Sequence, residues 1–158
     1  KYEQIKDEVS SFGLPKPKVM INTPYGENWF MAFTSSYMAR LISDAGGDYV
    51  YKKNDSNRSL PIDTEEAALL IDEADVWINV DGVSTLNELK GRFPRFADAP
   101  CVKKGEIYKS DLKRAPGGGN DFWESGVIYP DKVLSDMAKI FYPREMEGVE
   151  FTYYRKLE

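Results

Sequence analysis

The sequence contains no histidine and a single cysteine, and these two shortages exclude several classes of site. Without histidine the chain cannot supply a Ser-His-Asp or Cys-His catalytic group, nor any metal site with an imidazole ligand. Cys101 alone cannot form an internal disulfide or a cysteine-rich metal site, and its place after Pro100 favours a small buried side chain. The sequence therefore predicts no catalytic residue, no cofactor and no metal site of its own.

Long apolar runs and an excess of positive charge are also absent. A run of about 18 apolar residues, the length typical of a membrane-spanning helix, does not occur. The formal net charge of −5 argues against a nucleic-acid partner, because such partners favour a basic face. The 158 residues, 42% hydrophobic and 30% charged, are typical of one globular domain. Because the first residue is Lys1 and not Met, we expect a piece of a longer protein.

Hydrophobic periodicity predicts helices and strands in alternation. We expect strands at residues 18–22, 48–51, 76–80 and 102–108, and an edge strand at 149–154. We expect helices at residues 2–12, 35–45, 63–74, 84–89 and 130–142. Gly46 and Gly47 suit the end of the second helix, and Asp63 with Glu66 matches a capping box. The alternation predicts an α/β fold, a three-layer sandwich with a mostly parallel central sheet flanked by helices.

An ordered set of short segments resembles the C-terminal half of a known family. The segments are Thr23-Pro24-Tyr25-Gly26, Asp44-Ala45-Gly46-Gly47, Asp63-Thr64-Glu65-Glu66, Ala74 to Ile78, Val102 to Tyr108, and Asp131 to Pro143. Between residues 15 and 145 the chain resembles the helical-backbone (class III) periplasmic substrate-binding proteins of ferric-siderophore, haem and cobalamin ABC importers. The resemblance implies that residues 1–14 end an inter-lobe connecting helix and that residues 15–158 form the C-terminal substrate-binding lobe.

The resemblance also implies a function. The chain would belong to a non-enzymatic, extracytoplasmic binding protein, either periplasmic or anchored at the outer face of the membrane. Its ligand would be a metal chelate, with a ferric siderophore as first choice and cobalamin or haem as alternatives. Its partners would be the permease subunits of an importer and an N-terminal lobe of the same polypeptide. An α/β enzyme, or an interaction domain that kept this fold, is the remaining alternative; the sequence has neither a GxSxG elbow nor a GxGxxG loop.

Ligand-binding candidates lie in loops expected at one end of the sheet. The loop that follows the first strand stands where α/β sheets place ligand sites, and it offers Tyr25, Asn28, Trp29 and Phe30. We expect Trp29 first, or else Phe30, to present a flat apolar surface to a large chelate, the alternative being a place in the core. Arg58 and Arg114 lie in other loops, where a guanidinium suits carboxylate or catecholate oxygens or is simply solvated.

Residues 115–124, with the sequence APGGGNDFWE, form the most distinctive stretch. The stretch lacks the Lys-Ser/Thr that ends a P-loop, so it predicts no nucleotide site. The glycines beside Phe122 and Trp123 either form a wall of a cleft or make a turn before aromatics that pack on the last helix. Asp121 and Glu124 are expected to be solvated or to cap helices, because no partner group for acid–base chemistry is evident.

Glu65 and Glu66 open the helix that follows Asp63. The resemblance implies that an acidic residue here pairs with arginines of the permease, and Glu65 is the first candidate. A carboxylate at a helix N-terminus is favoured by the macrodipole, so Glu65 can equally serve the helix alone. Glu66 competes for the docking role, although its spacing from Asp63 suits a capping box.

Overall fold

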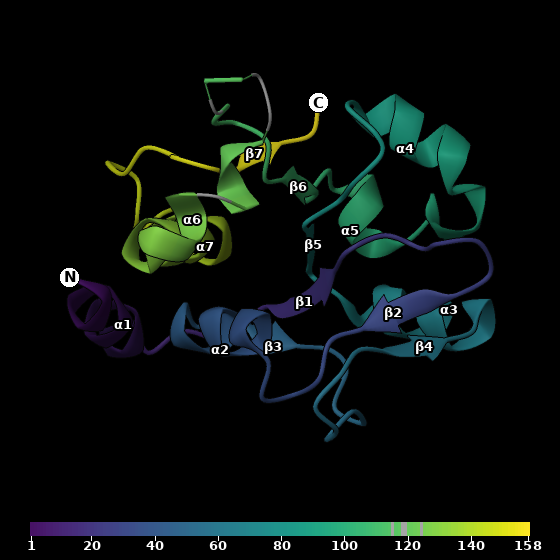
Figure 1. The fold of residues 1–158 in the computed structure, drawn as a ribbon, viewed down its shortest axis with the longest axis horizontal. Coiled ribbons are helices and arrows are strands. Elements are labelled where there is room, and N and C mark those ends of the chain that lie inside the picture. The colour runs from purple at the N-terminus through teal and green to yellow at the C-terminus, as the bar shows by residue number, and fades with distance from the viewer. Residues whose placement is uncertain (115, 118–119, 124) are drawn as a thin grey trace.

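A parallel sheet runs through the centre of the molecule (Figure 1). β1 (Lys18–Ile21) lies between β3 (Asp48–Tyr49) and β5 (Val76–Ile78), and both pairs are parallel. β5 is wholly buried and β1 is buried in all but its first residue, as expected for strands covered on both faces. The computed structural model describes residues 1–114, 116–117, 120–123 and 125–158. The predicted fold class, α/β with a mostly parallel sheet between helices, is confirmed.

Two short strands continue the sheet beyond β5. Ile107 forms a parallel bridge with Trp77, and β6 (Tyr108–Lys109) follows it directly. β7 (Arg155–Lys156) then pairs antiparallel with β6. The edge strand predicted at 149–154 is therefore displaced toward the C-terminus.

The strand predicted at residues 102–108 is shorter than expected. Its first part belongs to helix α5 (Pro100–Lys103), which Pro100 begins because a proline needs no N–H at the first helical turn. Cys101 lies in this helix with no exposed surface, and burial raises the pKa of its thiol to about 12. Only the end of the predicted segment therefore reaches the sheet, where Ile107 and Tyr108 lie beside β5.

Helices cover both faces of the sheet (Figure 1). On one face α2 (Tyr37–Asp44) packs against α7 (Pro130–Phe141), and α1 (Tyr2–Ser11) lies outside α7. On the other face α3 (Thr64–Glu73) packs against α5 and β1. The remaining helical segments are α4 (Leu86–Arg92), η1 (Pro94–Phe96), η2 (Asp121–Trp123) and α6 (Ser125–Ile128). In the described part of the chain, no helix is both long and apolar enough to cross a membrane.

Local signals fix several helix ends. Gly46 follows α2 with φ +87°, and a Cβ there would lie 2.6 Å from the ring of Tyr142, so a glycine is required. Asp63 caps α3 by accepting the Glu66 N–H at 2.9 Å, as predicted, but the Glu66 carboxylate lies 3.7 Å from Nζ of Lys53 instead of reaching back, so the predicted capping box is half formed. Ser36 caps α2 by accepting the Ala39 N–H with its hydroxyl, so the helix begins at Tyr37, two residues after the start of the predicted 35–45 segment.

A small two-stranded antiparallel sheet, absent from the sequence prediction, lies beside the parallel sheet. β2 (Trp29–Met31) pairs with β4 (Leu60–Ile62), and the two strands come from segments expected to be loops. Each has only three residues, too few for a clear alternating pattern, and Pro61 argues against a strand on sequence grounds. The β2–β4 pairing fixes the end of the loop that leaves β1.

Candidate functional site

The carboxyl ends of β1, β5 and β6 border a pocket of about 230 Å³, which we call the strand-end pocket. Ligands of open α/β sheets bind beyond the carboxyl ends of the strands, so this is the expected place for one. Val80 and Trp123 are its only apolar lining residues in the described part of the chain. The full lining is Asn22, Thr23, Asn79, Val80, Asp81, Lys109, Ser110, Asn120 and Trp123.

Asn22 and Asn79 directly follow β1 and β5, and both have a left-handed backbone, with φ of 66° and 58°. They are the only non-glycine residues with positive φ in the part of the chain that the structure describes. The Asn22 N–H donates to the carbonyl of Ile78 at 3.1 Å, and its own carbonyl accepts the indole N–H of Trp77 at 2.6 Å. Unusual backbone conformations persist where neighbours fix them, and they cluster at functional sites.

The side-chain amide of Asn79 is held by partners on two sides. Its Oδ1 accepts the hydroxyl of Tyr154 at 2.5 Å, and its Nδ2 lies 3.4 Å from the sulfur of Met38. Burial raises the pKa of Tyr154, and the nearby Asp136 carboxylate raises it further, so the phenol stays protonated and donates. The amide therefore has one orientation at the pocket wall.

Lys109 brings an ammonium group to the strand-end pocket. Its Nζ donates to the carbonyl of Val83 at 2.7 Å and lies 3.7 Å from Oδ2 of Asp111. Asp111 also accepts from Arg155, with 2.6 Å between Nε and Oδ1. Burial alone would raise the pKa of Asp111, but the hydrogen bond from Arg155 and the charges of Arg155, Lys109 and Arg114 lower it. This network fixes the side chain of Lys109, one of the residues that line the strand-end pocket.

Trp123 forms an exposed aromatic border of the strand-end pocket. Its side chain is 65% exposed, and its ring meets the buried ring of Phe122 edge to face, with 4.8 Å between centroids. Asn120, which also lines the pocket, accepts the Phe122 N–H through Oδ1 at 3.0 Å. The Trp123 ring is therefore accessible and is supported by the buried Phe122 ring, so it could stack on a flat ligand.

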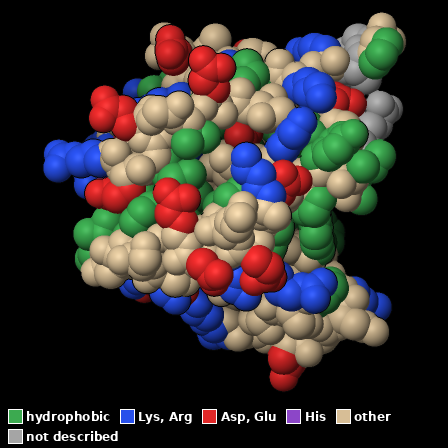
Figure 2. All heavy atoms as spheres, turned by 90° about the vertical axis from the view of Figure 1, so that its left-hand side faces the viewer, with side chains coloured by type: hydrophobic (Ala, Val, Ile, Leu, Met, Phe, Trp, Pro, Cys, Tyr) green, Lys and Arg blue, Asp and Glu red, His purple; other side chains and the backbone are tan. Residues whose placement is uncertain are grey.

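Further apolar side chains are exposed along α6, namely Val127, Ile128 and Tyr129 just after it. Figure 2 shows acidic and basic side chains interspersed over one face of the molecule, with hydrophobic side chains gathered along one side of the view. That face carries no extended field of a single sign.

Arg114, just before the predicted glycine-rich segment, and Asp121, within it, both form ion pairs. Arg114 forms an antiparallel bridge with Asn120, and its Nη2 lies 4.0 Å from Asp111 Oδ2, so this arginine stands next to the strand-end pocket. Asp121 accepts from the hydroxyl of Ser125 and lies 3.2 Å from Nζ of Lys113, a structural ion pair. The predictions for Ala115, Gly118, Gly119 and Glu124 lie outside the described residues.

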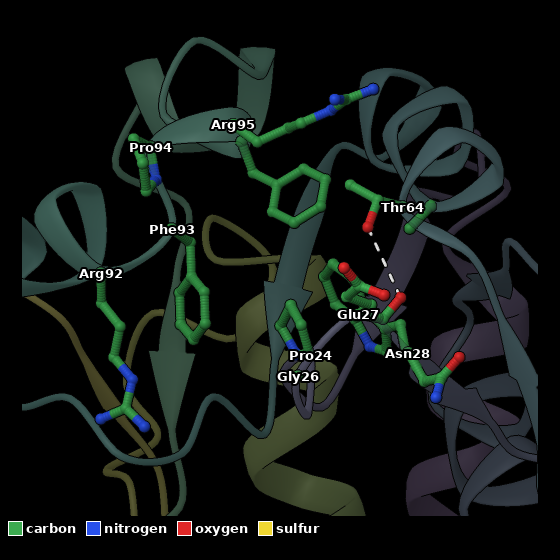
Figure 3. A pocket seen from close by; sticks show the side chains of 12 residues that line it. Pro24, Gly26, Glu27, Asn28, Thr64, Arg92, Phe93, Pro94 and Arg95 are labelled. Atoms are coloured by element: carbon green, nitrogen blue, oxygen red, sulfur yellow. Dashed lines mark hydrogen bonds between the residues drawn. The ribbon is translucent and has the colours of Figure 1, made fainter.

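A second hollow, of about 300 Å³, lies between the loop before β2 and the first turn of α3; we call it the loop pocket (Figure 3). Its lining includes Pro24, Glu27, Asn28, Thr64 and residues 92–96. The Thr64 hydroxyl donates to the carbonyl of Glu27 at 3.5 Å and so ties the loop to α3. Asn28 therefore lines this hollow and not the strand-end pocket.

The two acidic docking candidates differ in their surroundings. The Glu65 side chain is 80% exposed, and its Oε1 lies 3.3 Å from Nη2 of Arg95, which lines the loop pocket. The backbone N–H of Glu66 donates to the capping carboxylate of Asp63, and the Glu66 carboxylate lies 3.7 Å from Nζ of Lys53. Of the two, Glu65 is the more accessible carboxylate, with an internal cation beside it.

Trp29 and Phe30, the two aromatic residues that the sequence favoured as ligand contacts, do not line the strand-end pocket. Trp29 is 1% exposed, its indole N–H donates to the carbonyl of Ile21 at 2.9 Å, and it packs against Trp77 and Phe96. Trp29 is thus a core residue that only backs the loop pocket, which corrects the expectation that it faces the ligand first. Phe30 points the other way, as neighbours in a strand do, and is 44% exposed, but it lines neither pocket.

Tyr25 and Arg58 are both exposed and both stand apart from the two pockets. Tyr25 is 80% exposed in a tight turn in which its backbone pairs with that of Asn28. Arg58 belongs to the connection between β3 and β4, where its carbonyl accepts from the side chains of Asn54 and Ser56. Neither pocket includes Tyr25 or Arg58 in its lining.

Sequence reasoning missed the polar floor of the strand-end pocket, chiefly Asn22, Asn79 and Lys109. One signal was available, because β1 and β5 each end in an isoleucine that is followed by an asparagine, giving the dipeptides Ile21-Asn22 and Ile78-Asn79. Asparagine is among the few residues that adopt a left-handed backbone readily, so its repetition at two strand ends predicts two tight turns at one edge.

Comparisons with known proteins show the fold. No protein-family model matches the chain. An uncharacterized lipoprotein of Methanocaldococcus jannaschii is 27% identical over 144 residues, which cover 89% of this chain and 33% of the relative. The TroA-like periplasmic binding protein FepB of Veillonella parvula matches with a TM-score of 0.67 at 17% identity, over 99% of this chain and 53% of that one.

Two further solved structures give the same result. An ABC transporter solute-binding protein of Sulfurospirillum deleyianum matches with a TM-score of 0.68 at 16% identity, over 92% of this chain and 43% of that one. IsdE of S. aureus, solved with haem, matches with a TM-score of 0.58 at 23% identity, over 89% of this chain and 53% of that one. The chain thus has the fold of TroA-like periplasmic binding proteins and spans about half the length of the solved chains and a third of the curated relative.

Proposed function

We propose that this chain is the C-terminal substrate-binding lobe of an extracytoplasmic protein that delivers a metal chelate, first of all a ferric siderophore, to an ABC importer. The observation that carries the proposal is the strand-end pocket, which opens at the carboxyl ends of the parallel strands of a binding-protein fold. The polar groups of the pocket suit binding, and among its described lining residues no hydroxyl is hydrogen-bonded to a side-chain base.

The lining of the pocket supports an oxygen-rich ligand. Asn79 and Lys109 offer N–H donors, Thr23 and Ser110 offer hydroxyls, and Trp123 offers an aromatic surface at the border. Ferric siderophores present anionic catecholate, hydroxamate or carboxylate oxygens, which such donors bind through charge-assisted hydrogen bonds. The iron would arrive already coordinated, so the lobe would need no metal ligand of its own.

Haem and cobalamin are the alternative ligands within the same proposal. The match to IsdE, which was solved with haem, supports haem, and the exposed ring of Trp123 could stack on either macrocycle. The polar floor favours the siderophore, because its oxygens could accept hydrogen bonds from Asn79 and Lys109, whereas the flat face of a haem or corrin ring accepts none.

The remaining parts of the proposal concern partners and location. Residues 1–14, which contain α1, would end the connecting helix of a two-lobed protein whose N-terminal lobe supplies the opposite wall of the cleft. Glu65 would dock on arginines of the permease, with Glu66 as a weaker second candidate. A location in the periplasm, or at the outer face of the membrane through a lipid anchor, is supported by the lipoprotein relative and by the periplasmic neighbours.

Titration of the full-length gene product tests the proposal. Ferric enterobactin, ferric citrate, haemin and cyanocobalamin are added separately while tryptophan fluorescence and heat of binding are recorded. We expect a ferric siderophore to bind with Kd of about 1 μM or tighter, and the iron-free siderophore to bind more weakly. Binding by none of the four probes contradicts the proposal.

The isolated lobe provides a second comparison. Because one lobe offers half of the cleft, we expect residues 1–158 alone to bind the same chelate far more weakly than the full-length protein. Equal affinity of the lobe and the full-length protein would refute the half-cleft arrangement.

A further inference from the structure

Tyr154 stands behind the strand-end pocket and is not part of its lining. Its side chain has no exposed surface, and its hydroxyl donates to Oδ1 of Asn79 at 2.5 Å. Tyr154 contacts the lining of the pocket through Asn79, and its ring also lies 5.6 Å from the Phe122 ring between centroids. The Phe122 ring in turn supports Trp123.

The hydroxyl can act on Asn79 only if Tyr154 itself is fixed. The buried carboxylate of Asp136, on α7, accepts three successive backbone N–H groups of the C-terminal segment, those of Thr152, Tyr153 and Tyr154, at distances from 2.6 to 3.1 Å. Asp136 is 1% exposed, so water does not compete for these bonds. The segment is therefore held to α7 at the residue whose hydroxyl reaches Asn79.

The contacts of Asn79 allow one orientation of its amide. A flipped amide would place Oδ1 against the sulfur of Met38, which has no hydrogen to donate. The flip would also leave the buried O–H of Tyr154 without an acceptor, and an unpaired buried donor is destabilising. The oxygen thus stays with Tyr154, and the NH₂ group, of which the Met38 contact uses one hydrogen, stays on the other side.

We propose that Tyr154 is a positioning residue of the strand-end pocket, which fixes the Asn79 oxygen and thereby makes the pocket present an amide N–H to an acceptor oxygen of the ligand. The ligand half of this inference rests on the proposed function, whereas the control of Asn79 by Tyr154 does not. The ligand class follows from the donor: an anionic oxygen acceptor such as a catecholate or carboxylate gains a hydrogen bond there, and an apolar macrocycle gains none.

The test compares two neighbouring tyrosines in the full-length gene product. Tyr154→Phe removes the hydroxyl that reaches Asn79. Tyr153→Phe is the matched control, because Tyr153 is equally buried and equally bound to Asp136, but its hydroxyl lies 2.7 Å from Ser125 Oγ instead. We expect Tyr154→Phe to weaken binding of ferric enterobactin by about 10-fold, and Tyr153→Phe to leave it within about 2-fold. Equal losses in both variants would reduce Tyr154 to a structural role and overturn the inference.

A double-mutant cycle separates positioning from general destabilisation. If Tyr154 acts through Asn79, then Tyr154→Phe should have no further effect on ferric enterobactin binding in an Asn79→Ala background. Additive losses contradict the inference. Should Tyr154→Phe fail to fold, Asn79→Asp serves in its place, because it keeps an acceptor for Tyr154 and removes the donor from the pocket; unchanged affinity in Asn79→Asp would also overturn the inference.

A measurement without ligand distinguishes failure of this inference from failure of the proposed function. The side-chain ¹⁵N–¹H₂ resonances of Asn79 are assigned in the ligand-free protein through their loss in Asn79→Ala. We expect them to shift or broaden in Tyr154→Phe and to stay unchanged in Tyr153→Phe. If no chelate binds the wild-type protein, the proposed function fails, and unchanged Asn79 resonances in Tyr154→Phe separately overturn the positioning role.

Discussion

Asn22 and Asn79 occupy equivalent places on two paired strands. Their preceding residues, Ile21 and Ile78, are partners in the register of β1 and β5, and both asparagines then turn into the left-handed region with φ of 66° and 58°. A side chain with a Cβ loses about 1–2 kcal/mol in that region, and asparagine loses less because it bonds locally. At the carboxyl ends of both strands, asparagine therefore contributes through its backbone conformation as well as through its side chain.

Substitution of Asn22 separates these two contributions. We expect Asn22→Gly to keep or slightly raise the free energy of unfolding, because glycine adopts positive φ without strain, and Asn22→Ala to lower it by about 1 kcal/mol. Urea denaturation followed by circular dichroism measures both. Asn28→Ala is the control, because Asn28 is exposed and its φ is not positive. An Asn22→Ala variant as stable as the wild type contradicts the expectation.

The ion-pair network at Asp111 predicts a loss of stability in acid. Its pKa is lowered in the folded protein despite burial, because Arg155 donates to it and Lys109 and Arg114 lie near. A lowered folded-state pKa stabilises the protein above the unfolded-state value of about 3.9, and this stabilisation is lost as the pH falls below that value toward the folded-state pKa. We expect the free energy of unfolding to decline below about pH 4.

Asp111→Asn tests the assignment. At pH 7 we expect the variant to lose about 1.5–3 kcal/mol, because hydrogen bonds to a charged acceptor are replaced by weaker ones. Its free energy of unfolding should also decline less steeply than that of the wild type below about pH 4. Asp98→Asn is the control, since Asp98 is exposed and carries no ion pair in the described part of the chain. If the free energy of unfolding depends on pH in the same way in the wild type and in Asp111→Asn, the loss of stability in acid comes from other groups and the expectation is wrong.

Much of the fold was predictable because its signals are local. The apolar stripes of α1 and α7, the Asp63 cap and the glycine after α2 each depend on residues close in sequence. The β2–β4 pairing was not predictable in the same way. Its register pairs Phe30 with Pro61, two residues far apart in the chain, and three-residue strands carry almost no periodicity.

The candidate site was predictable only in part, for a physical reason. Trp29 and Trp123 look alike in sequence, since each lies in a loop rich in glycine or proline. What separates them is tertiary: the β2–β4 pairing turns Trp29 toward Trp77, whereas Phe122 takes the buried position beside Trp123 and leaves Trp123 outside. Exposure of an aromatic residue follows from which neighbour fills the core, and single-sequence patterns do not encode that choice.

Trp123 should therefore be the tryptophan that reports on the solvent. Trp123 is 65% exposed, whereas Trp29 and Trp77 are 1% and 0% exposed. We expect Trp123→Phe to remove nearly all quenching of native fluorescence by iodide and to change the free energy of unfolding by less than about 0.5 kcal/mol. Trp29→Phe is the comparison, and it should keep the quenching but lower stability, because it leaves a void and an unpaired Ile21 carbonyl. If iodide still quenches the fluorescence of Trp123→Phe, Trp123 is not the exposed tryptophan and the expectation is wrong.

The pair of Glu65 and Arg95 leads to a prediction about docking, which depends on the proposed transport function. An arginine 3.3 Å from Glu65 competes with any permease arginine for the same carboxylate. Both side chains are largely exposed, so the internal pair contributes only about 0.2–1 kcal/mol. We expect Arg95→Ala to raise the affinity of the full-length protein for its permease in nanodiscs by about 2- to 5-fold, more at low than at high salt.

Glu65→Ala should have the opposite effect and weaken docking, while Glu66→Ala should change it little, because the Glu66 carboxylate faces Lys53 and its backbone N–H serves the cap of α3. Arg58→Ala is the matched control for removal of one exposed positive charge away from Glu65. If Arg95→Ala weakens docking as much as Glu65→Ala does, Arg95 itself contacts the permease, and the internal competition is wrong. If Arg58→Ala raises the affinity equally, the gain comes from net charge, since added negative charge anywhere on the surface would strengthen attraction to a basic permease.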